Sequence, residues 1–240
     1  MRNKFLSWCV HFYTATGLVA AAGMAVLIIR GGDESFRAAI LLMIVATVID
    51  STDGTLARRV RVTQWTPGFD GRRLDDITDF HTYVSLPLFL IWRVGILPGV
   101  QAWWLLAPLL ASAYWFCQTE AKTEDGYFLG FPSYWNAIAF YLYFLRPPAV
   151  VALGFILLFS LITFVPSRYL YPSHGGPFSR TTILLSALWG ALLVLIVTGV
   201  FEDTRAMVWA SLAFPIYYLA VSWSISFMLT QRRRGAEAQR

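Results

Sequence analysis

Residues 48–79 read VIDSTDGTLARRVRVTQWTPGFDGRRLDDITD, and apolar segments flank this stretch on both sides. It contains two spaced pairs of aspartates, Asp50 with Asp53 and Asp75 with Asp79. On a helix, residues three or four apart share a face, so each pair presents two carboxylates on the same side. Carboxylates at a membrane boundary are costly to desolvate unless something neutralises them. Two such pairs that face each other would form an oxygen-rich site for hard divalent cations.

The composition is that of an integral membrane protein. Hydrophobic residues make up 57% of the 240 residues and the mean hydropathy is +0.57, whereas only 14% are charged. That is well below the quarter typical of soluble domains. We therefore expect an all-α integral membrane protein in which residues 1–240 form one domain. Because a bilayer core needs about twenty apolar residues per helix, we expect about eight transmembrane helices. These lie near Phe5–Ile29, Phe36–Ser51, Thr78–Val94, Val100–Cys117, Tyr134–Leu145, Ala149–Val165, Thr181–Val200 and Ala206–Leu229.

The basic residues indicate how these helices are oriented. If both termini are cytoplasmic, the inside segments hold 14 of the 19 lysines and arginines, and the outside loops hold the other 5. This distribution follows the positive-inside rule and places the aspartates on the cytoplasmic side. The net charge of +5 and the cluster Arg232–Arg234 suit contact with anionic membrane lipids. Nucleic-acid binding is not favoured, because the basic residues follow the topology and do not gather on one soluble face.

Small and basic residues accompany the aspartates. Gly54 and Ala57 share a helix face with the first pair and leave space for a flat or bulky ligand. Arg58 and Arg61 follow on the same stripe and offer donors suited to phosphate oxygens. The turn signal at residues 66–68, Thr-Pro-Gly, predicts that the chain reverses there, so that the two acidic faces can meet. A helix end with solvated charges would explain the arginines but not the paired acids.

The order and spacing of these residues resemble the signature of the CDP-alcohol phosphotransferase family. The signature positions are Asp53, Gly54, Ala57, Arg58, Gly71, Asp75 and Asp79, with Asp50 as the upstream acid. The spacer between Arg58 and Gly71, residues 59–70, is longer than in the commonest family form and resembles the phosphatidylcholine synthase branch. Residues 10–17 and 122–136 are also similar to that branch.

The resemblance implies an enzyme that transfers the phosphatidyl group of CDP-diacylglycerol to an alcohol and releases CMP. It implies two divalent ions, Mn²⁺ or Mg²⁺, held by Asp50, Asp53, Asp75 and Asp79. Asp79 would also be the general base that takes the proton of the alcohol. The CDP-diacylglycerol site would be lined by Asp50, Gly54, Ala57, Arg58 and Gly71. The resemblance further implies a homodimer in the bacterial inner membrane, with the active site facing the cytoplasm.

The branch implies choline as the acceptor alcohol. A quaternary ammonium is recognised by aromatic faces, with a carboxylate nearby. Tyr83 lies one helical turn beyond Asp79 on the same face, which makes it a candidate. Further candidates are Trp115, Glu124, Tyr127 and Trp135. The roles of His11 and Lys122 stay open between packing or solvation and contact with a substrate.

Two alternative functions compete with choline transfer. A related enzyme that uses serine, glycerol phosphate or inositol phosphate would need an extra basic pocket if its acceptor is acidic or phosphorylated. The long spacer and residues 122–136 favour choline. An ion-coupled transporter would carry its acids near the bilayer midplane on broken helices in paired halves. In this chain the acids gather at one interface and no repeat is evident.

Overall fold

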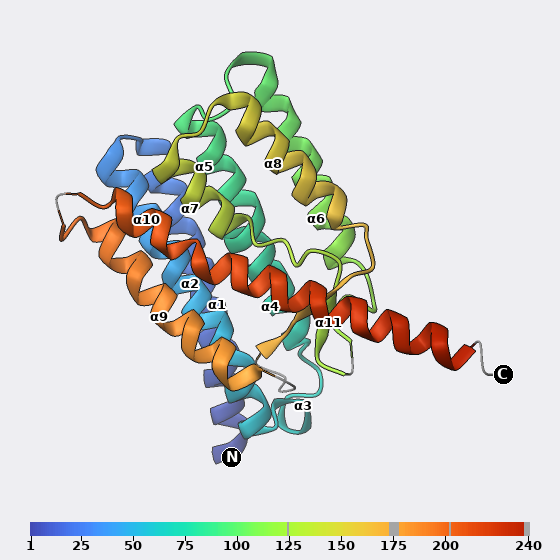
Figure 1. Cartoon of the computed structure of the whole chain (residues 1–240). Coiled ribbons are helices and arrows are strands. Elements are labelled where there is room, and N and C mark those ends of the chain that lie inside the picture. The colour runs from blue at the N-terminus through green and yellow to red at the C-terminus, as the bar shows by residue number, and fades with distance from the viewer. Residues whose placement is uncertain (124, 173–177, 202, 238–240) are drawn as a thin grey trace. The chain divides into compact units, whose positions relative to one another are not determined.

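The computed structural model describes residues 1–240 except 124, 173–177, 202 and 238–240. The described chain is almost entirely helical (Figure 1), as expected, apart from one two-stranded sheet that we did not predict. It forms two compact units, one of residues 1–109 with 134–154 and one of residues 110–133 with 155–240. That both belong to a single domain stays a prediction.

The first unit contains α1 (Arg2–Arg30), α2 (Asp33–Val60), α3 (Val62–Trp65), α4 (Gly71–Asp79), the π-helix η1 (Phe80–Ser85), α5 (Leu86–Val94), the 3₁₀-helix η2 (Gly99–Leu105) and α7 (Trp135–Leu145). Two helices run from one unit into the other, α6 (Leu106–Phe116) and α8 (Ala149–Ile162). The second unit contains β1 (Tyr127–Leu129), β2 (Arg168–Leu170), α9 (Ser179–Thr198), α10 (Arg205–Ser211) and α11 (Ala213–Glu237).

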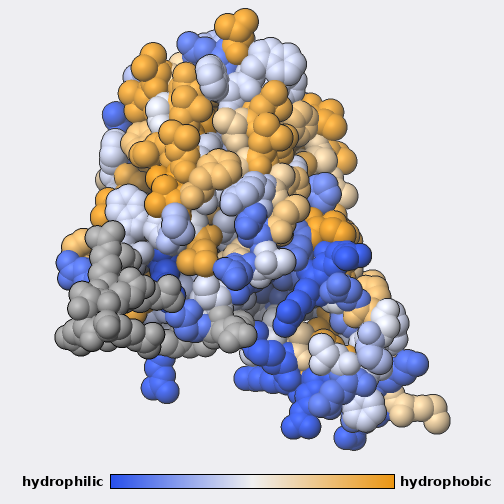
Figure 2. Space-filling model, turned by 90° about the vertical axis from the view of Figure 1, so that its right-hand side faces the viewer, coloured by the Kyte–Doolittle hydropathy of each residue, from blue (hydrophilic) through white to orange (hydrophobic). Residues whose placement is uncertain are grey.

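Apolar helices identify a membrane protein. Within the described ranges, four helical segments are long and apolar enough to cross a bilayer, namely Arg2–Arg30, Asp33–Val60, Ser179–Thr198 and Arg205–Leu229. Figure 2 shows a face on which hydrophobic side chains cover a wide area. The count of eight spans stays a prediction. For example, the 11 residues of α7 rise only about 16 Å, roughly half of a bilayer core.

Helix α1 is the element against which the first unit packs. It lies along α2 and also contacts α3, α4 and α5. Its close approach to α4 occurs at Gly17, where a Cβ atom would lie 2.5 Å from Cγ2 of Thr78. Thr78 is buried, and its hydroxyl donates a hydrogen bond to the Leu74 carbonyl at 2.8 Å. A side chain at position 17 would therefore push α4 away from α1.

The small sheet lies in the second unit. Its strands β1 and β2 are antiparallel, with the pairs Tyr127–Leu170, Phe128–Tyr169 and Leu129–Arg168. Helix α11 satisfies further polar groups of β2. The N–H groups of Arg168 and Leu170 donate to the hydroxyls of Ser226 and Ser222, both at 3.1 Å. The hydroxyl of Tyr218 donates to the Leu170 carbonyl at 2.8 Å. Residues 218, 222 and 226 are spaced by four, so one face of α11 supplies all three partners.

We predict that Gly17→Ala lowers the thermal unfolding temperature of the detergent-solubilised protein. Forcing a methyl group into a packed interior costs about 1–3 kcal/mol, which exceeds the gain of about 1 kcal/mol from replacing a helical glycine by alanine. Gly154→Ala is the matched control, because Gly154 is exposed on α8 and a Cβ atom there meets nothing within 4 Å. It should leave the unfolding temperature unchanged or raise it.

Thr78→Ser should rescue Gly17→Ala, because serine keeps the hydroxyl that bonds to Leu74 and removes the methyl group that clashes. An equal loss in the two alanine variants, or no rescue in the double variant, would contradict the proposed close contact between α1 and α4.

Candidate active site

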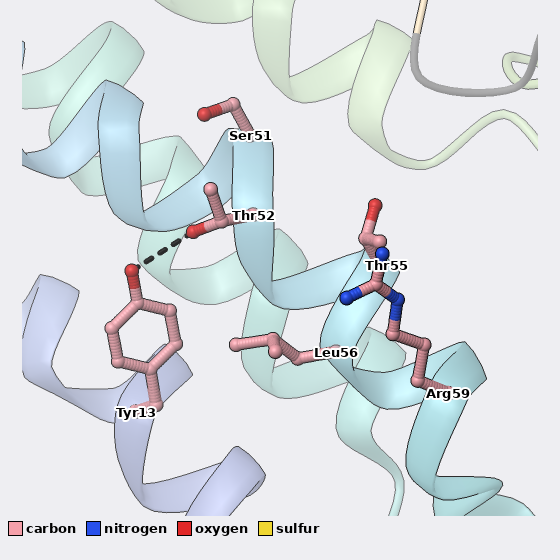
Figure 3. A pocket seen from close by; sticks show the side chains of 6 residues that line it. All are labelled: Tyr13, Ser51, Thr52, Thr55, Leu56 and Arg59. Atoms are coloured by element: carbon pink, nitrogen blue, oxygen red, sulfur yellow. Dashed lines mark hydrogen bonds between the residues drawn. The ribbon is translucent and has the colours of Figure 1, made fainter.

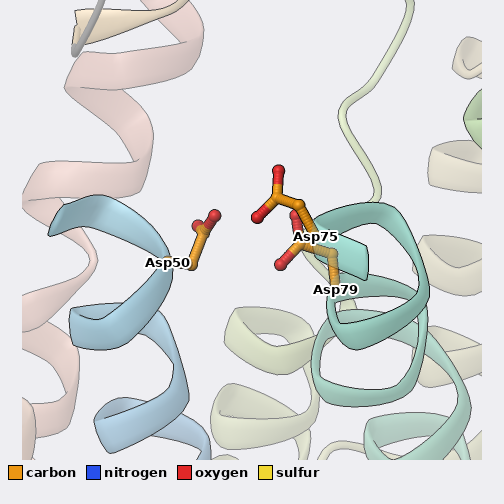
Figure 4. Close-up of side chains that lie close together, drawn as sticks. All are labelled: Asp50, Asp75 and Asp79. Atoms are coloured by element: carbon orange, nitrogen blue, oxygen red, sulfur yellow. The ribbon is translucent and has the colours of Figure 1, made fainter. Parts of the chain in front are cut away.

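Three aspartates converge in the first unit. Asp50 comes from α2, and Asp75 and Asp79 come from α4; the carboxylates point toward one another (Figure 4). One oxygen from each carboxylate lies within 4.8 Å of the others, and all three residues are half-buried. Like charges at this separation repel, and partial burial strengthens the repulsion. A divalent cation would offset it, and carboxylate oxygens are its preferred ligands, so this cluster can hold a metal ion.

Asp53, the fourth aspartate of the predicted set, does not belong to this three-residue group. It lies almost one helical turn beyond Asp50 on α2 and is only 4% exposed. A second ion that uses Asp53 therefore stays a prediction.

The chain reverses between α2 and α4 as the sequence predicts. Helix α2 ends at Val60, and the next residue, Arg61, adopts the left-handed conformation with φ +58°. The short helix α3 was not predicted, but a turn at Pro67 and Gly68 follows it, as expected. Asp70 caps α4 by accepting a hydrogen bond from the backbone N–H of Arg73 at 3.1 Å. This reversal brings the aspartates of α4 back beside α2.

Tyr83 is bonded to the carboxylate cluster. Its hydroxyl donates to Oδ2 of Asp50 at 2.7 Å. Tyr83 lies in the π-helix η1, in which the N–H of Leu86 bonds to the His81 carbonyl five residues earlier. Pro87 follows directly and has no N–H to bond the Tyr83 carbonyl, which accounts for a break in the α-helical pattern at this point. Tyr83 lies on the side of this helix that faces Asp50 of α2.

Three residues that the sequence analysis did not select support this contact. Asn136 of α7 donates to the hydroxyl of Thr47 at 3.1 Å, and Thr47 lies almost one turn before Asp50 and interacts with the Tyr83 phenol. The ring of Tyr134 lies 6.3 Å from that of Tyr83. The branch resemblance at residues 122–136 reached Asn136 but gave it no role.

The glycines of the predicted nucleotide site are at close contacts. A Cβ atom on Gly54 would lie 3.3 Å from Nη1 of Arg58, and Arg58 also donates to the Thr55 hydroxyl at 3.1 Å. A Cβ atom on Gly71 would lie 2.8 Å from Cε1 of His11. Ala57 is half-buried on the α2 face that carries Asp50. The buried His11 ring explains a glycine at 71, whereas the neighbour of Gly54 is the flexible end of an exposed side chain. A role of these residues in binding CDP-diacylglycerol stays a prediction.

His11 joins α1 to the long spacer. Its Nε2 lies 2.9 Å from the Thr66 hydroxyl, and its ring packs against Phe69 at 4.5 Å and Trp8 at 5.7 Å between centroids. The two sequence features that resemble the same branch, residues 10–17 and the spacer, are therefore in direct contact. This favours the packing role for His11 that the sequence left open.

The predicted choline-binding residues are divided between the two units. Tyr83 and Trp135 belong to the first unit, and Trp135 is fully buried. Trp115 and Tyr127 belong to the second, where the Trp115 indole donates to the Leu129 carbonyl at 2.7 Å. Glu124 lies outside the described residues. Of these residues, Tyr83 is hydrogen-bonded to the carboxylate cluster through Asp50.

The face of Tyr127 carries a cation from the protein itself. The guanidinium of Arg168 lies 5.5 Å from the Tyr127 ring centroid and also pairs with Asp125. A hydrogen bond from the Thr123 hydroxyl, together with Arg168, holds the pKa of Asp125 below its ordinary value. Choline would have to displace Arg168 in order to stack on this face of Tyr127.

Curated proteins similar to this chain agree with the site. No protein-family model matches the chain. The chain is 34% identical over 231 residues to a phosphatidylcholine synthase of Legionella pneumophila, an alignment that covers 93% of this chain and 89% of that protein. It is 35% identical over 190 residues to a phosphatidylcholine synthase of Pseudomonas aeruginosa, with 78% of each chain covered. The chain belongs to the phosphatidylcholine synthase family.

Membership of the phosphatidylcholine synthase family extends the likeness past Asn136, where the sequence resemblance ended. A phosphatidylcholine synthase of Borreliella burgdorferi is 29% identical over 244 residues, which cover 97% of this chain and 98% of that protein. Because the family is one of enzymes, the transporter alternative is removed.

We predict that Tyr83→Phe weakens Mn²⁺ binding about tenfold, because loss of an outer-shell hydrogen bond typically reduces metal affinity 10–100-fold. Only the hydroxyl that orients Asp50 is removed. Free Mn²⁺ can be measured by electron paramagnetic resonance during titration of the purified protein. Tyr217→Phe is the matched control, since its hydroxyl bonds to Thr182 in the second unit at 3.2 Å. Unchanged affinity in Tyr83→Phe, with Asp75→Asn reducing it, would contradict the orienting role.

Proposed function

We propose that the protein transfers the phosphatidyl group of CDP-diacylglycerol to choline and forms phosphatidylcholine and CMP. The observation that carries this proposal is the convergence of Asp50, Asp75 and Asp79 in a chain of the phosphatidylcholine synthase family. The reaction moves a phosphoryl group between two oxygens, and such reactions depend on positioning and on neutralisation of charge. A carboxylate cluster that can bind a divalent cation meets that need.

In the proposed reaction the hydroxyl oxygen of choline attacks the β-phosphorus of CDP-diacylglycerol. A bond from this oxygen to phosphorus forms, the bond to the bridging oxygen breaks, and CMP leaves with the bonding electron pair. Asp79 takes the hydroxyl proton. An alcohol is a weak nucleophile, so a positioned base contributes about 10²–10⁴-fold to the rate. Divalent metal bound at the cluster would supply charge neutralisation for the diphosphate.

We assign the nucleotide side of the site to the α2 face that carries Gly54, Ala57 and Arg58, with Gly71 across from it. Arg58 is exposed and donates to the Thr55 hydroxyl of its own helix at 3.1 Å, and its planar guanidinium carries donors suited to phosphate oxygens. Asp53 would complete the ligands for a second ion, and Mn²⁺ is the ion we propose, with Mg²⁺ as the alternative.

For choline we favour Tyr83 with Tyr134. Their rings lie 6.3 Å apart, Tyr83 is hydrogen-bonded to Asp50, and Tyr134 is half-buried, so part of its surface stays accessible. Aromatic faces next to carboxylates attract a quaternary ammonium. We favour choline over glycerol phosphate or inositol phosphate as the acceptor because the similar curated proteins are phosphatidylcholine synthases.

One assay tests the activity. Purified protein with CDP-diacylglycerol, labelled choline and Mn²⁺ should yield labelled phosphatidylcholine and CMP in equal amounts, and chelation of the metal should abolish both. Asp79→Asn should lower the rate at least about 100-fold, since it removes the proposed base. Asp70→Asn is the control, because Asp70 caps α4 outside the cluster. Activity with serine alone would refute choline as the acceptor, and full activity in Asp79→Asn would refute the base.

We further propose eight spans, a homodimer, and a location in the bacterial inner membrane with the carboxylate cluster facing the cytoplasm. The excess of basic residues in the expected inside segments supports this orientation.

Single cysteines test the topology. In a variant without Cys9 and Cys117, Arg72→Cys should react with a membrane-impermeant maleimide only in inverted vesicles. Val100→Cys, at a residue that is 82% exposed beyond α5, should react in cells whose inner membrane is accessible from outside. Labelling of both cysteines from the same side would show that the span count between them is wrong.

A further inference from the structure

A pocket lies on the side of α2 that faces away from the carboxylate cluster. It has a volume of about 450 Å³, and its lining residues are Tyr13 of α1 and Ser51, Thr52, Thr55, Leu56 and Arg59 of α2 (Figure 3). On an ideal helix, Thr52 and Arg59 lie about 180° around the axis from Asp50. The pocket is therefore separate from the carboxylate cluster, although the same helix carries both.

The chemistry of the lining suits an anion. Arg59 is exposed, and among the described residues no acidic side chain lines the pocket. The hydroxyls of Tyr13 and Thr52 lie 2.8 Å apart in the pocket (Figure 3). Ser51 and Thr52 donate to the Val48 carbonyl, and serine and threonine exchange such bonds within a helix for other partners by rotating the side chain. A guanidinium beside hydroxyls is a recurrent arrangement for phosphate oxygens.

The residues next to the pocket indicate that the anion belongs to a lipid. Val48 and Val45 precede Thr52 by one and two helical turns on the same face of α2, and they are 55% and 48% exposed. The stripe thus passes from apolar residues to hydroxyls and then to a guanidinium. A glycerophospholipid has the same order of acyl chain, glycerol ester and phosphate. A free phosphate ion would make no use of the valines.

We propose that this pocket binds the phosphate of an anionic glycerophospholipid from the surrounding membrane. An anionic headgroup is favoured because the pocket offers one cation and, among its lining residues, no carboxylate for an ammonium group. The proposal does not depend on the proposed activity, since it concerns binding at the opposite face of α2.

Native mass spectrometry of the delipidated full-length protein, titrated with phosphatidylglycerol, tests the proposal. Arg59→Gln should weaken binding of the first lipid about tenfold, because one charge-assisted contact is lost. Arg73→Gln is the matched control, because this arginine is exposed on α4 and does not line the pocket. Its ion pair with Asp70 is long, at 4.0 Å, so the substitution removes the same charge with little loss of structure. This variant should bind as the unmodified protein does, and inorganic phosphate should not displace the lipid.

Four results would overturn the proposal. These are unchanged affinity in Arg59→Gln, an equal loss in Arg73→Gln, an equal loss of phosphatidylcholine affinity in Arg59→Gln, and displacement of the lipid by inorganic phosphate. If Arg59→Gln does not elute as a single folded species, Thr55→Val serves in its place, and it should weaken binding about threefold by removing one hydrogen-bonding hydroxyl. Because each readout is a binding constant, failure here and failure of the transferase assay are distinguishable.

Discussion

Three carboxylates lie close together in the first unit and repel one another, so the packing of this unit has to overcome their repulsion. Asp50 and the two aspartates of α4 can approach only if α2 and α4 are held together by other contacts. Helix α1 supplies them on one side, through Gly17 against Thr78. Tyr83 supplies one on the other side, through its hydrogen bond to Asp50. A site assembled in this way is prepared for a cation, because the helix packing has already opposed the repulsion that a cation relieves.

The same contacts explain the segment at residues 10–17 as a packing surface. His11 bonds to the spacer at Thr66, Tyr13 bonds to α2 at Thr52, and Gly17 admits α4. The three residues thus contact the spacer, α2 and α4, in that order. The length of the spacer has a related cause, since its extra residues form α3 and carry Phe69 to the His11 ring. The segment and the spacer depend on each other.

Features set by local sequence could be predicted, and those set by distant contacts could not. Helix periodicity, the turn at residues 66–68 and the acid spacing are local, and the structure agrees with them. The β1–β2 pair joins residues some forty positions apart and takes hydrogen bonds from α11, so no local pattern announces it. The spacing placed Tyr83 on the helix face of Asp79, but its hydrogen bond to Asp50 joins residues 33 positions apart and has no local signal in the sequence. The aromatic candidates for choline binding were selected by residue type, and the structure distributes them over both units.

Helix α2 carries both Asp50 of the carboxylate cluster and most of the pocket lining. It is one continuous helix from Asp33 to Val60, so its two faces cannot move independently. The face with Asp50 and Asp53 lies toward the interior of the unit, whereas Val48, Thr52 and Arg59 lie on the opposite side. A metal site needs its ligands held within about 0.5 Å of the productive geometry. The contacts that seat α2 against α1 and Asp50 against Tyr83 therefore set the position of this carboxylate relative to α4.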